Sequence, residues 1–216
     1  MTFEIFDYRT TNRNILVTPE IRARLYRMEP GQVDGRHSHD LGHELFLILE
    51  GRAAFEISGE IRELGPGELC VARSEEIHQV RNLLPDKPTI MYLSVTPHIQ
   101  PTHTGRKEDG SKEQPPRFRP NSAYDVEGDP SIGAEALADR YLEALQSLAQ
   151  AVDASLNVQQ AQVIAFKEAV ANGDTPSALR ARDQMWDGLY PLFKQMSAMG
   201  AAWNSFTART AESESK

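Results

Sequence analysis

The spacing of apolar residues changes near residue 131 and divides the chain into a strand-like part and a helical part. Before this point, short apolar, aromatic and β-branched runs alternate with turn signals such as Pro30-Gly31 and Pro85-Asp86. The predicted strands are residues 21–29, 44–50, 52–58, 68–72, 77–83 and 88–96. Many short strands with close turns are typical of a β-sandwich or a β-barrel.

Beyond residue 131 the apolar residues follow helical spacing, and we expect about three helices. The stripe of the first helix consists of Leu137, Tyr141, Leu145, Leu148 and Val152. The second helix covers residues 157–171, where Asn157 and Gln160 resemble a capping box and Gly173 has the position of a helix-terminating glycine.

The third predicted helix begins at Thr175 as its N-cap, with Pro176 at the first helical position. Its apolar stripe is rich in tryptophan, phenylalanine and methionine, which is more typical of a core or a dimer face than of a chemical site. Pro191 has no backbone N–H and is expected to kink this helix or to divide it.

These patterns suggest four segments. Residues 1–97 form the strand-rich domain, a β-sandwich or β-barrel. Residues 98–130, which are rich in proline and contain a polar run at 105–114, form a linker or lid. Residues 131–210 form a helical region, and residues 211–216 a disordered tail.

The composition is that of a globular protein, since 40% of the 216 residues are hydrophobic and 25% are charged. The formal net charge of -8 argues against nucleic-acid binding, because an acidic chain repels phosphate backbones. No apolar run is long enough to span a membrane, and the first residues lack the pattern of a signal peptide. The single cysteine, Cys70, cannot form an internal disulfide, which fits a reducing compartment. We therefore expect a cytoplasmic protein.

The histidines are confined to a short part of the chain, between positions 37 and 103. His37 and His39 are two residues apart, so both rings point to one face of an extended chain. Glu44 begins the next predicted strand, and His78 lies on a later strand that sheet closure could bring opposite the pair. Three imidazoles and one carboxylate suit Fe(II), Mn(II), Ni(II), Co(II) or Zn(II). Two histidines two residues apart are common by chance, so the prediction of a metal site depends on the residues around them.

The surrounding residues resemble the two sequence motifs of the cupin family. Residues 31–51, GQVDGRHSHDLGHELFLILEG, resemble the first motif along its full length, and residues 64–82, LGPGELCVARSEEIHQVRN, resemble the second. The second segment lacks the usual proline midway between the glycine and the histidine, where Arg73 and Ser74 stand. The resemblance does not extend to the helical part of the chain.

The resemblance implies a cupin-type jelly-roll barrel, also called a double-stranded β-helix, with a helical extension after it. It also implies one divalent transition metal per chain. The implied metal ligands are His37, His39, Glu44 and His78. The alternative is a cupin barrel that retains these residues without a functional metal.

Strand parity separates Glu44 from its neighbour His43, because successive residues of a strand point to opposite faces. The family pattern places Glu44 inside, so His43 points outward, where it has a structural or interface role or supports the site indirectly. The outward face also carries Leu45, Leu47 and Leu49. A strand that is apolar on both faces is covered on both, so we expect a second subunit, as in a homodimer, or the helices to bury these leucines.

Several other residues are candidates for the pocket. Asn82 shares parity with the ligand His78, and Tyr92 is a candidate on residues 88–96. His98 and His103 flank the proline-rich segment and either close over the pocket or lie on the surface.

Residues 21–29 carry further candidates, Arg24 and Tyr26, which share one face with Arg22. A substrate carboxylate would favour an inward arginine, although parity alone does not say which face of this strand is inward. The alternative is that these arginines are solvated.

An octahedral metal with four protein ligands has about two open positions for water, substrate or dioxygen. By resemblance, many cupins with this ligand set are dioxygenases, whereas others are isomerases, lyases, decarboxylases or sensors. Our first hypothesis is a metal-dependent, dioxygenase-like enzyme that acts on a small organic molecule. The alternatives are a non-enzymatic sensor or small-ligand binder, and a redox-neutral lyase or isomerase.

Overall fold

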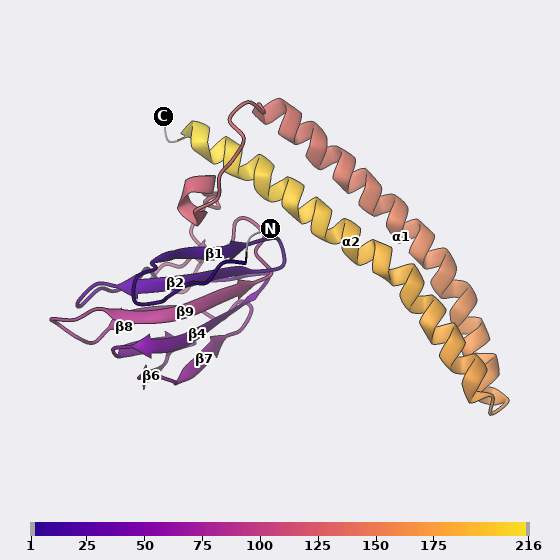
Figure 1. Ribbon diagram of the computed structural model, residues 1–216, viewed down its shortest axis with the longest axis horizontal. Coiled ribbons are helices and arrows are strands. Elements are labelled where there is room, and N and C mark those ends of the chain that lie inside the picture. Colours follow the sequence, from indigo (N-terminus) through magenta and orange to yellow (C-terminus); the bar gives the residue numbers. More distant parts are fainter. Residues whose placement is uncertain (1–2, 215–216) are drawn as a thin grey trace. The chain divides into compact units, whose positions relative to one another are not determined.

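The computed structural model describes residues 3–214, which fall into two compact units. One unit contains the residues up to 129 together with those from 207 onward, and the other contains residues 130–206. The strands belong to the first unit, and most of two long helices form the second (Figure 1). Along the chain the elements are β1 (Arg13–Val17), β2 (Arg22–Met28), β3 (His37–Ser38), β4 (His43–Glu50), β5 (Ala53–Ile57), β6 (Glu60–Leu64), β7 (Leu69–Ala72), β8 (His78–Asn82), β9 (Thr89–Thr96), β10 (Thr104–Gly105), the 3-10 helix η1 (Asn121–Tyr124), α1 (Ala134–Ala171) and α2 (Thr175–Glu214).

The strands form two five-stranded antiparallel sheets that pack as a jelly-roll barrel. One sheet has the strand order β1-β2-β9-β4-β7, and the other has the order β10-β3-β8-β5-β6. Strands that are distant in sequence lie side by side, as β2, β9 and β4 do in Figure 1. The predicted barrel is therefore confirmed.

The barrel core lies between the two sheets, and every second side chain of β4 points into it. Glu44, Phe46 and Ile48 are buried, whereas the leucines between them are half-buried. The removal of the inward apolar side chains from water is the main favourable contribution to folding of the barrel. The core cluster comprises Met28, Phe46, Ile48, Ala53, Phe55, Leu64, Ala72, Val80, Met91 and Leu93.

Four strands lie outside the predicted set, namely β1, β3, β6 and β10. The pattern of β6 explains its omission, because Leu64 is its only buried residue and no apolar alternation marks it. β3 and β10 contain two residues each, which is too short for a periodic signal.

The outer face of the first sheet is apolar around β4. Leu45, Leu47 and Leu49 are half-buried, and β7 continues the same surface. On β7, which pairs with β4, Leu69 is 50% exposed and Val71 43% exposed. The expected cover of this face by a second subunit stays a prediction.

The proline-rich segment after residue 97 is part of the barrel unit, not a free linker between two units. Thr104 in β10 pairs with Ser38 in β3, so this segment adds an edge strand to the second sheet. The segment also contributes η1, where Tyr124 is buried.

The prediction of three helices is wrong, since the chain forms two. Asn157 and Gln160 lie inside α1, so the capping-box pattern there does not begin a helix. α2 continues through Pro191 without division. Contacts with α1 on both sides of the proline hold the helix in register. Before the proline, the Gln159 side chain donates to the Met185 carbonyl, and beyond it the rings of Tyr141 and Trp203 have centroids 5.1 Å apart.

The turn between the helices follows helix-capping rules. Gly173 has a φ of +69°, the left-handed conformation that favours glycine after a helix. The N-cap of α2 is Asp174 rather than the predicted Thr175, because the Asp174 carboxylate accepts from the Ser177 backbone N–H. The expected disordered tail is helical as far as Glu214, and residues 215–216 lie outside the described residues. In the described part of the chain, no helix combines the length and apolarity needed to cross a membrane.

Asn82 ties the loops at one edge of the barrel together. Its side-chain amide donates to the carbonyls of Met28, Glu29 and Lys87. Its side-chain oxygen accepts from the Leu84 backbone N–H and the Thr89 hydroxyl. The residue is 2% exposed, so water would not replace these bonds.

Replacement of Asn82 by alanine is expected to lower the free energy of unfolding by about 2 to 4 kcal/mol, because buried backbone groups lose their partners. Arg81→Ala, an exposed change on the same strand, is the control and should cost less than about 0.5 kcal/mol. Chemical unfolding followed by circular dichroism measures both variants. Equal stability of the two variants would contradict this role for Asn82.

Candidate metal centre

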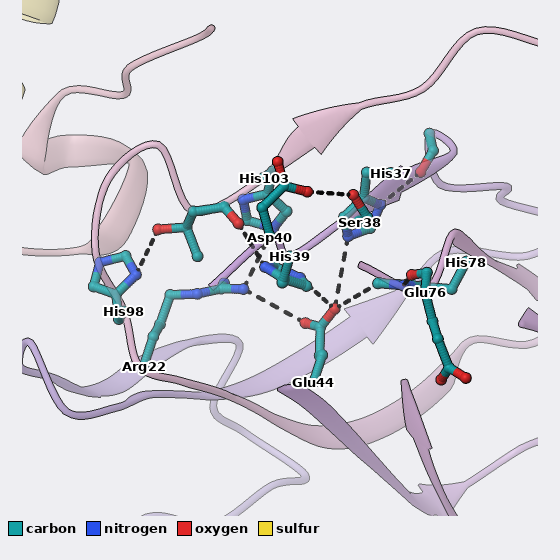
Figure 2. A network of polar contacts seen from close by, with 12 residues as sticks. Arg22, His37, Ser38, His39, Asp40, Glu44, Glu76, His78, His98 and His103 are labelled. Atoms are coloured by element: carbon teal, nitrogen blue, oxygen red, sulfur yellow. Dashed lines mark hydrogen bonds and ion pairs between the residues drawn. The ribbon is translucent and has the colours of Figure 1, made fainter. Parts of the chain in front are cut away.

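Three strands bring the predicted ligands to one place inside the barrel. β3 carries His37, β4 carries Glu44 and β8 carries His78, while His39 follows directly after β3. His37 and His78 are opposite one another in the pairing of β3 with β8. One donor atom from each of the four residues lies within 4.8 Å of the others, and Figure 2 shows the rings converging on Glu44.

One oxygen of Glu44 is at the centre of the cluster. Its Oε2 is 2.8 Å from Nε2 of His39, 3.1 Å from Nε2 of His78 and 3.6 Å from Nε2 of His37. Glu44, His39 and His78 have side chains at most 3% exposed, whereas that of His37 is 18% exposed. His37 is thus the most accessible member of the cluster.

Backbone carbonyls orient all three rings in the same way. Nδ1 of His37 donates to the Gly35 carbonyl at 2.9 Å, and Nδ1 of His78 donates to the Glu76 carbonyl at 2.8 Å. Nδ1 of His39 donates to the Thr102 carbonyl at 2.6 Å. Because a carbonyl only accepts, Nδ1 of each ring carries a proton, and Nε2 of each ring points toward Glu44. In the neutral form of such a ring, Nε2 has the free lone pair that binds a metal.

Burial and the contact between Glu44 and the rings shift the pKa values of the cluster in different directions. Burial alone would raise the pKa of Glu44, but the surrounding imidazoles hold it well below its usual value, so the carboxylate is ionised. Burial lowers the pKa of His39, which favours its neutral ring. Burial alone would also lower the pKa of His37, but its contact with the Glu44 carboxylate raises it. Nε2 of His37 is buried and has no hydrogen-bond partner among the described residues. A cation bound between the Glu44 carboxylate and the three Nε2 atoms would satisfy all four groups.

The donor set fits a transition metal. Donors bound to one metal at about 2.0–2.2 Å lie roughly 3 Å apart when they are adjacent. The separations of the Glu44 oxygen from His39 and His78, 2.8 and 3.1 Å, agree with this spacing, and the separation from His37, 3.6 Å, is somewhat longer. The mixed nitrogen and oxygen set suits Fe(II), Mn(II), Ni(II), Co(II) or Zn(II).

Arg22 on β2 holds the other oxygen of Glu44. Its Nη2 lies 3.5 Å from Oε1 of Glu44 and 3.4 Å from Nε2 of His103. A guanidinium only donates, so Nε2 of His103 accepts. Burial, followed by the charge of Arg22, lowers the pKa of His103 well below its usual value. This arrangement leaves Oε2 of Glu44 directed at the imidazoles.

The only sequence signal for Arg22 is its strand parity with Arg24. His103 lies against the ligands, with its ring centroid 4.9 Å from that of His37 and 4.7 Å from that of His39. His98 is also buried and is hydrogen-bonded to Thr102. Neither histidine is a simple surface residue.

Two cavities adjoin the cluster. The inner one, of about 120 Å³, has His37, Glu44 and His103 on its polar side. Its apolar side consists of Phe46, Val80, Met91 and Leu93. The outer one, of about 780 Å³, is bounded partly by the proline-rich segment. The residues that line both cavities are Arg22, Arg24, Asp34, His37 and His103.

The predicted pocket residues divide into two groups. Arg24 and Tyr26 line the inner cavity, so their face of β2 is the inward one. Tyr92 lies on the outer face, because its register partners in the sheet are Leu25 and Leu47; its neighbours Met91 and Leu93 are the inward residues, and the pocket prediction for it is wrong.

Two further candidates have structural contacts. The amide of Asn82 is hydrogen-bonded to loop backbone groups, so this residue supports the barrel edge and not the pocket. His43 is exposed, and its Nδ1 accepts from the Ser74 backbone N–H at 2.9 Å.

Comparison with known proteins identifies the barrel. Residues 24–95 match the family model of the cupin domain, a segment that includes both predicted motifs and all four clustered residues. A search of curated protein sequences gives no match.

Three solved structures each match less than half of the chain at low identity. An uncharacterized conserved protein with a double-stranded beta-helix domain from Klebsiella pneumoniae is 22% identical, over 44% of this chain and 91% of its own, with a TM-score of 0.41. The DMSP lyase DddQ from Ruegeria pomeroyi is 24% identical, over 44% of this chain and 47% of its own, with a TM-score of 0.38. The salicylate 1,2-dioxygenase from Pseudoaminobacter salicylatoxidans is 18% identical, over 37% and 23%, with a TM-score of 0.34.

Replacement of His37 or His39 by alanine is expected to abolish metal binding, because each change removes one ligand and leaves the barrel core intact. Metal analysis of protein purified without added metal should give about one divalent transition metal per wild-type chain. His43→Ala, which removes a neighbouring histidine that points outward, should retain it. Stoichiometric metal in His37→Ala and His39→Ala would show that the metal binds elsewhere.

Proposed function

Residues 24–95 of the chain are a cupin domain, and on this premise we propose that the protein is a metal-dependent enzyme acting on a small organic molecule in a dioxygenase-like reaction. The observation that carries the proposal is the buried cluster of three imidazole nitrogens around Oε2 of Glu44, which borders the inner cavity. A metal held there would act as a Lewis acid and, if it were iron, would activate dioxygen.

The residues of the chain have distinct roles in this proposal. His37, His39, Glu44 and His78 hold the metal. Because Arg22 contacts the second oxygen of Glu44, the carboxylate is a ligand with a fixed orientation rather than a free general base. The apolar side of the inner cavity gives an organic substrate a surface on which to pack and limits the access of bulk water.

Oxygen uptake tests the proposed reaction. The protein, loaded in turn with Fe(II), Mn(II) and Zn(II), is incubated with catechols, thiols and enols in an oxygen electrode. We expect at least one compound to consume dioxygen only with the redox-active metals, and to give a product that contains oxygen from the gas. His39→Ala is the control without a complete ligand set.

Two outcomes would contradict this proposal. Product formation at the same rate without dioxygen, and with Zn(II) as well, indicates a redox-neutral lyase or isomerase. Saturable binding of compounds without turnover by any metal form indicates a sensor or small-ligand binder.

We also propose that the protein is a homodimer in which a second copy covers the apolar outer face around β4 and β7. Exposed contiguous apolar surface is typical of such contacts, and Leu69 and Val71 extend the half-buried leucine face of β4.

Sedimentation velocity tests the dimer. The variant Leu47→Glu with Leu69→Glu is expected to be a monomer, because it places two charges at the centre of the face. Ile61→Glu, an exposed apolar residue on the other sheet, is the control and should remain dimeric. A monomeric wild-type protein would overturn the proposal.

A further inference from the structure

The outer cavity is cationic although the chain is acidic. Seven arginine and lysine side chains line it together with three carboxylates, whereas the whole chain has a formal net charge of -8. The local excess of positive charge is therefore not a property of the surface as a whole. A concave surface of one sign raises the local concentration of ligands of the opposite sign.

Most of the cationic residues at this cavity already have carboxylate partners. Arg106 and Lys112 both pair with Asp40, and Arg36 pairs with Glu56. Arg22 contacts Glu44, and Arg117 lies 3.7 Å from a carboxylate oxygen of Glu113. These pairs neutralise much of the positive charge of the cavity. One arginine beside the metal centre lacks such a carboxylate partner.

Arg24 is that residue. It lines both cavities, and no ion pair joins it to a carboxylate within residues 3–214. Its Nε is buried and has no hydrogen-bond partner in the same range. Asp34 lines the same cavities, but its Oδ1 accepts from the Tyr26 hydroxyl at 2.9 Å and from the Gln32 amide at 2.8 Å. A buried guanidinium donor without a partner is costly, and a bound anion would satisfy it.

The Arg24 guanidinium is held in place before any ligand binds. It lies over the ring of Tyr26, 4.5 Å from the centroid, which is a favourable cation–π distance. Tyr26 is itself fixed by Asp34 and by Gln32, whose amide donates to the Tyr26 hydroxyl at 2.7 Å. An oriented guanidinium loses little freedom when it binds a planar anion in a bidentate manner.

The inner cavity adds a second requirement. The polar residues His37, Glu44 and Arg24 meet an apolar side formed by Phe46, Val80, Met91 and Leu93. A purely inorganic anion would leave that apolar side without a contact. A short organic molecule with one carboxylate would satisfy both sides.

We propose that the substrate is a small organic carboxylate, whose carboxylate binds Arg24 while its apolar body packs in the inner cavity beside the metal centre. This inference rests on the proposed function, and it names the substrate class for the same site. Arg24 binds the substrate and takes no part in holding the metal.

Binding of matched carboxylate and amide pairs to the metal-loaded protein tests the inference. The probes are butyrate with butyramide and benzoate with benzamide, measured by isothermal titration calorimetry, with inorganic phosphate as a further anion. We expect at least one carboxylate to bind about tenfold or more tightly than its amide, as a charge-assisted bidentate contact gives, and more tightly than phosphate.

Variants on one strand assign the preference to Arg24. Arg24→Gln should reduce the carboxylate-to-amide ratio to within about twofold, and Arg24→Lys should retain part of it, because lysine keeps the charge but not the planar fork. Arg27→Gln is the matched control, since Arg27 is exposed on the opposite face of β2, and it should preserve the ratio. Metal content and thermal unfolding are measured for each variant.

The outcomes separate this inference from the proposed function. A wild-type protein with stoichiometric metal that binds amides or phosphate as tightly as the carboxylates would overturn the inference and leave the metal centre standing. An unchanged ratio in folded, metal-loaded Arg24→Gln would overturn it as well. Wild-type protein without stoichiometric metal would instead refute the proposed function. If Arg24→Gln does not fold, the carboxylate-to-amide affinity ratios of the wild-type protein and of Arg24→Lys still test the inference.

Discussion

An ionised carboxylate inside an apolar barrel is destabilising unless positive charge or hydrogen-bond donors meet it, and the side chain of Glu44 is only 3% exposed. Its Oε1 is met by Arg22. Its Oε2 instead faces the Nε2 atoms of three imidazoles, whose Nδ1 atoms donate to backbone carbonyls. A cation at the centre would compensate the carboxylate and bind the free Nε2 lone pairs, and the surrounding structure keeps these four groups facing one another.

The supports of the site come from widely separated parts of the chain. The carbonyls of Gly35, Glu76 and Thr102 orient the three rings, so two loops and the proline-rich segment each contribute one contact. Such outer contacts fix ring orientation and raise ligand affinity. The segment after residue 97 is therefore part of the site, because it supplies both the Thr102 carbonyl and the wall of the outer cavity.

Short strands between turn signals predicted a sandwich or a barrel, and the resemblance to the two cupin motifs implied the barrel and the four clustered residues. With Glu44 placed inside by that resemblance, strand alternation predicted the outward direction of His43. Strand alternation did not show which face of β2 points into the barrel, since residues 22–28 carry arginine on both faces. Only the pairing with β9 shows which face is the inward one. Arg22 and His103 lie 81 residues apart, a contact that no local pattern encodes. The helices were divided incorrectly because Asn157 and Pro191 are local signals that the packing of α1 along α2 overrides.

The coordination of a bound metal is the most direct test of the central claim. Crystals of protein purified without added metal are measured above and below the absorption edge of the metal found by elemental analysis. We predict one anomalous peak per chain, about 2.0–2.2 Å from Nε2 of His37, His39 and His78 and from Oε2 of Glu44. A peak at another set of residues, or ligation through Nδ1, would contradict it.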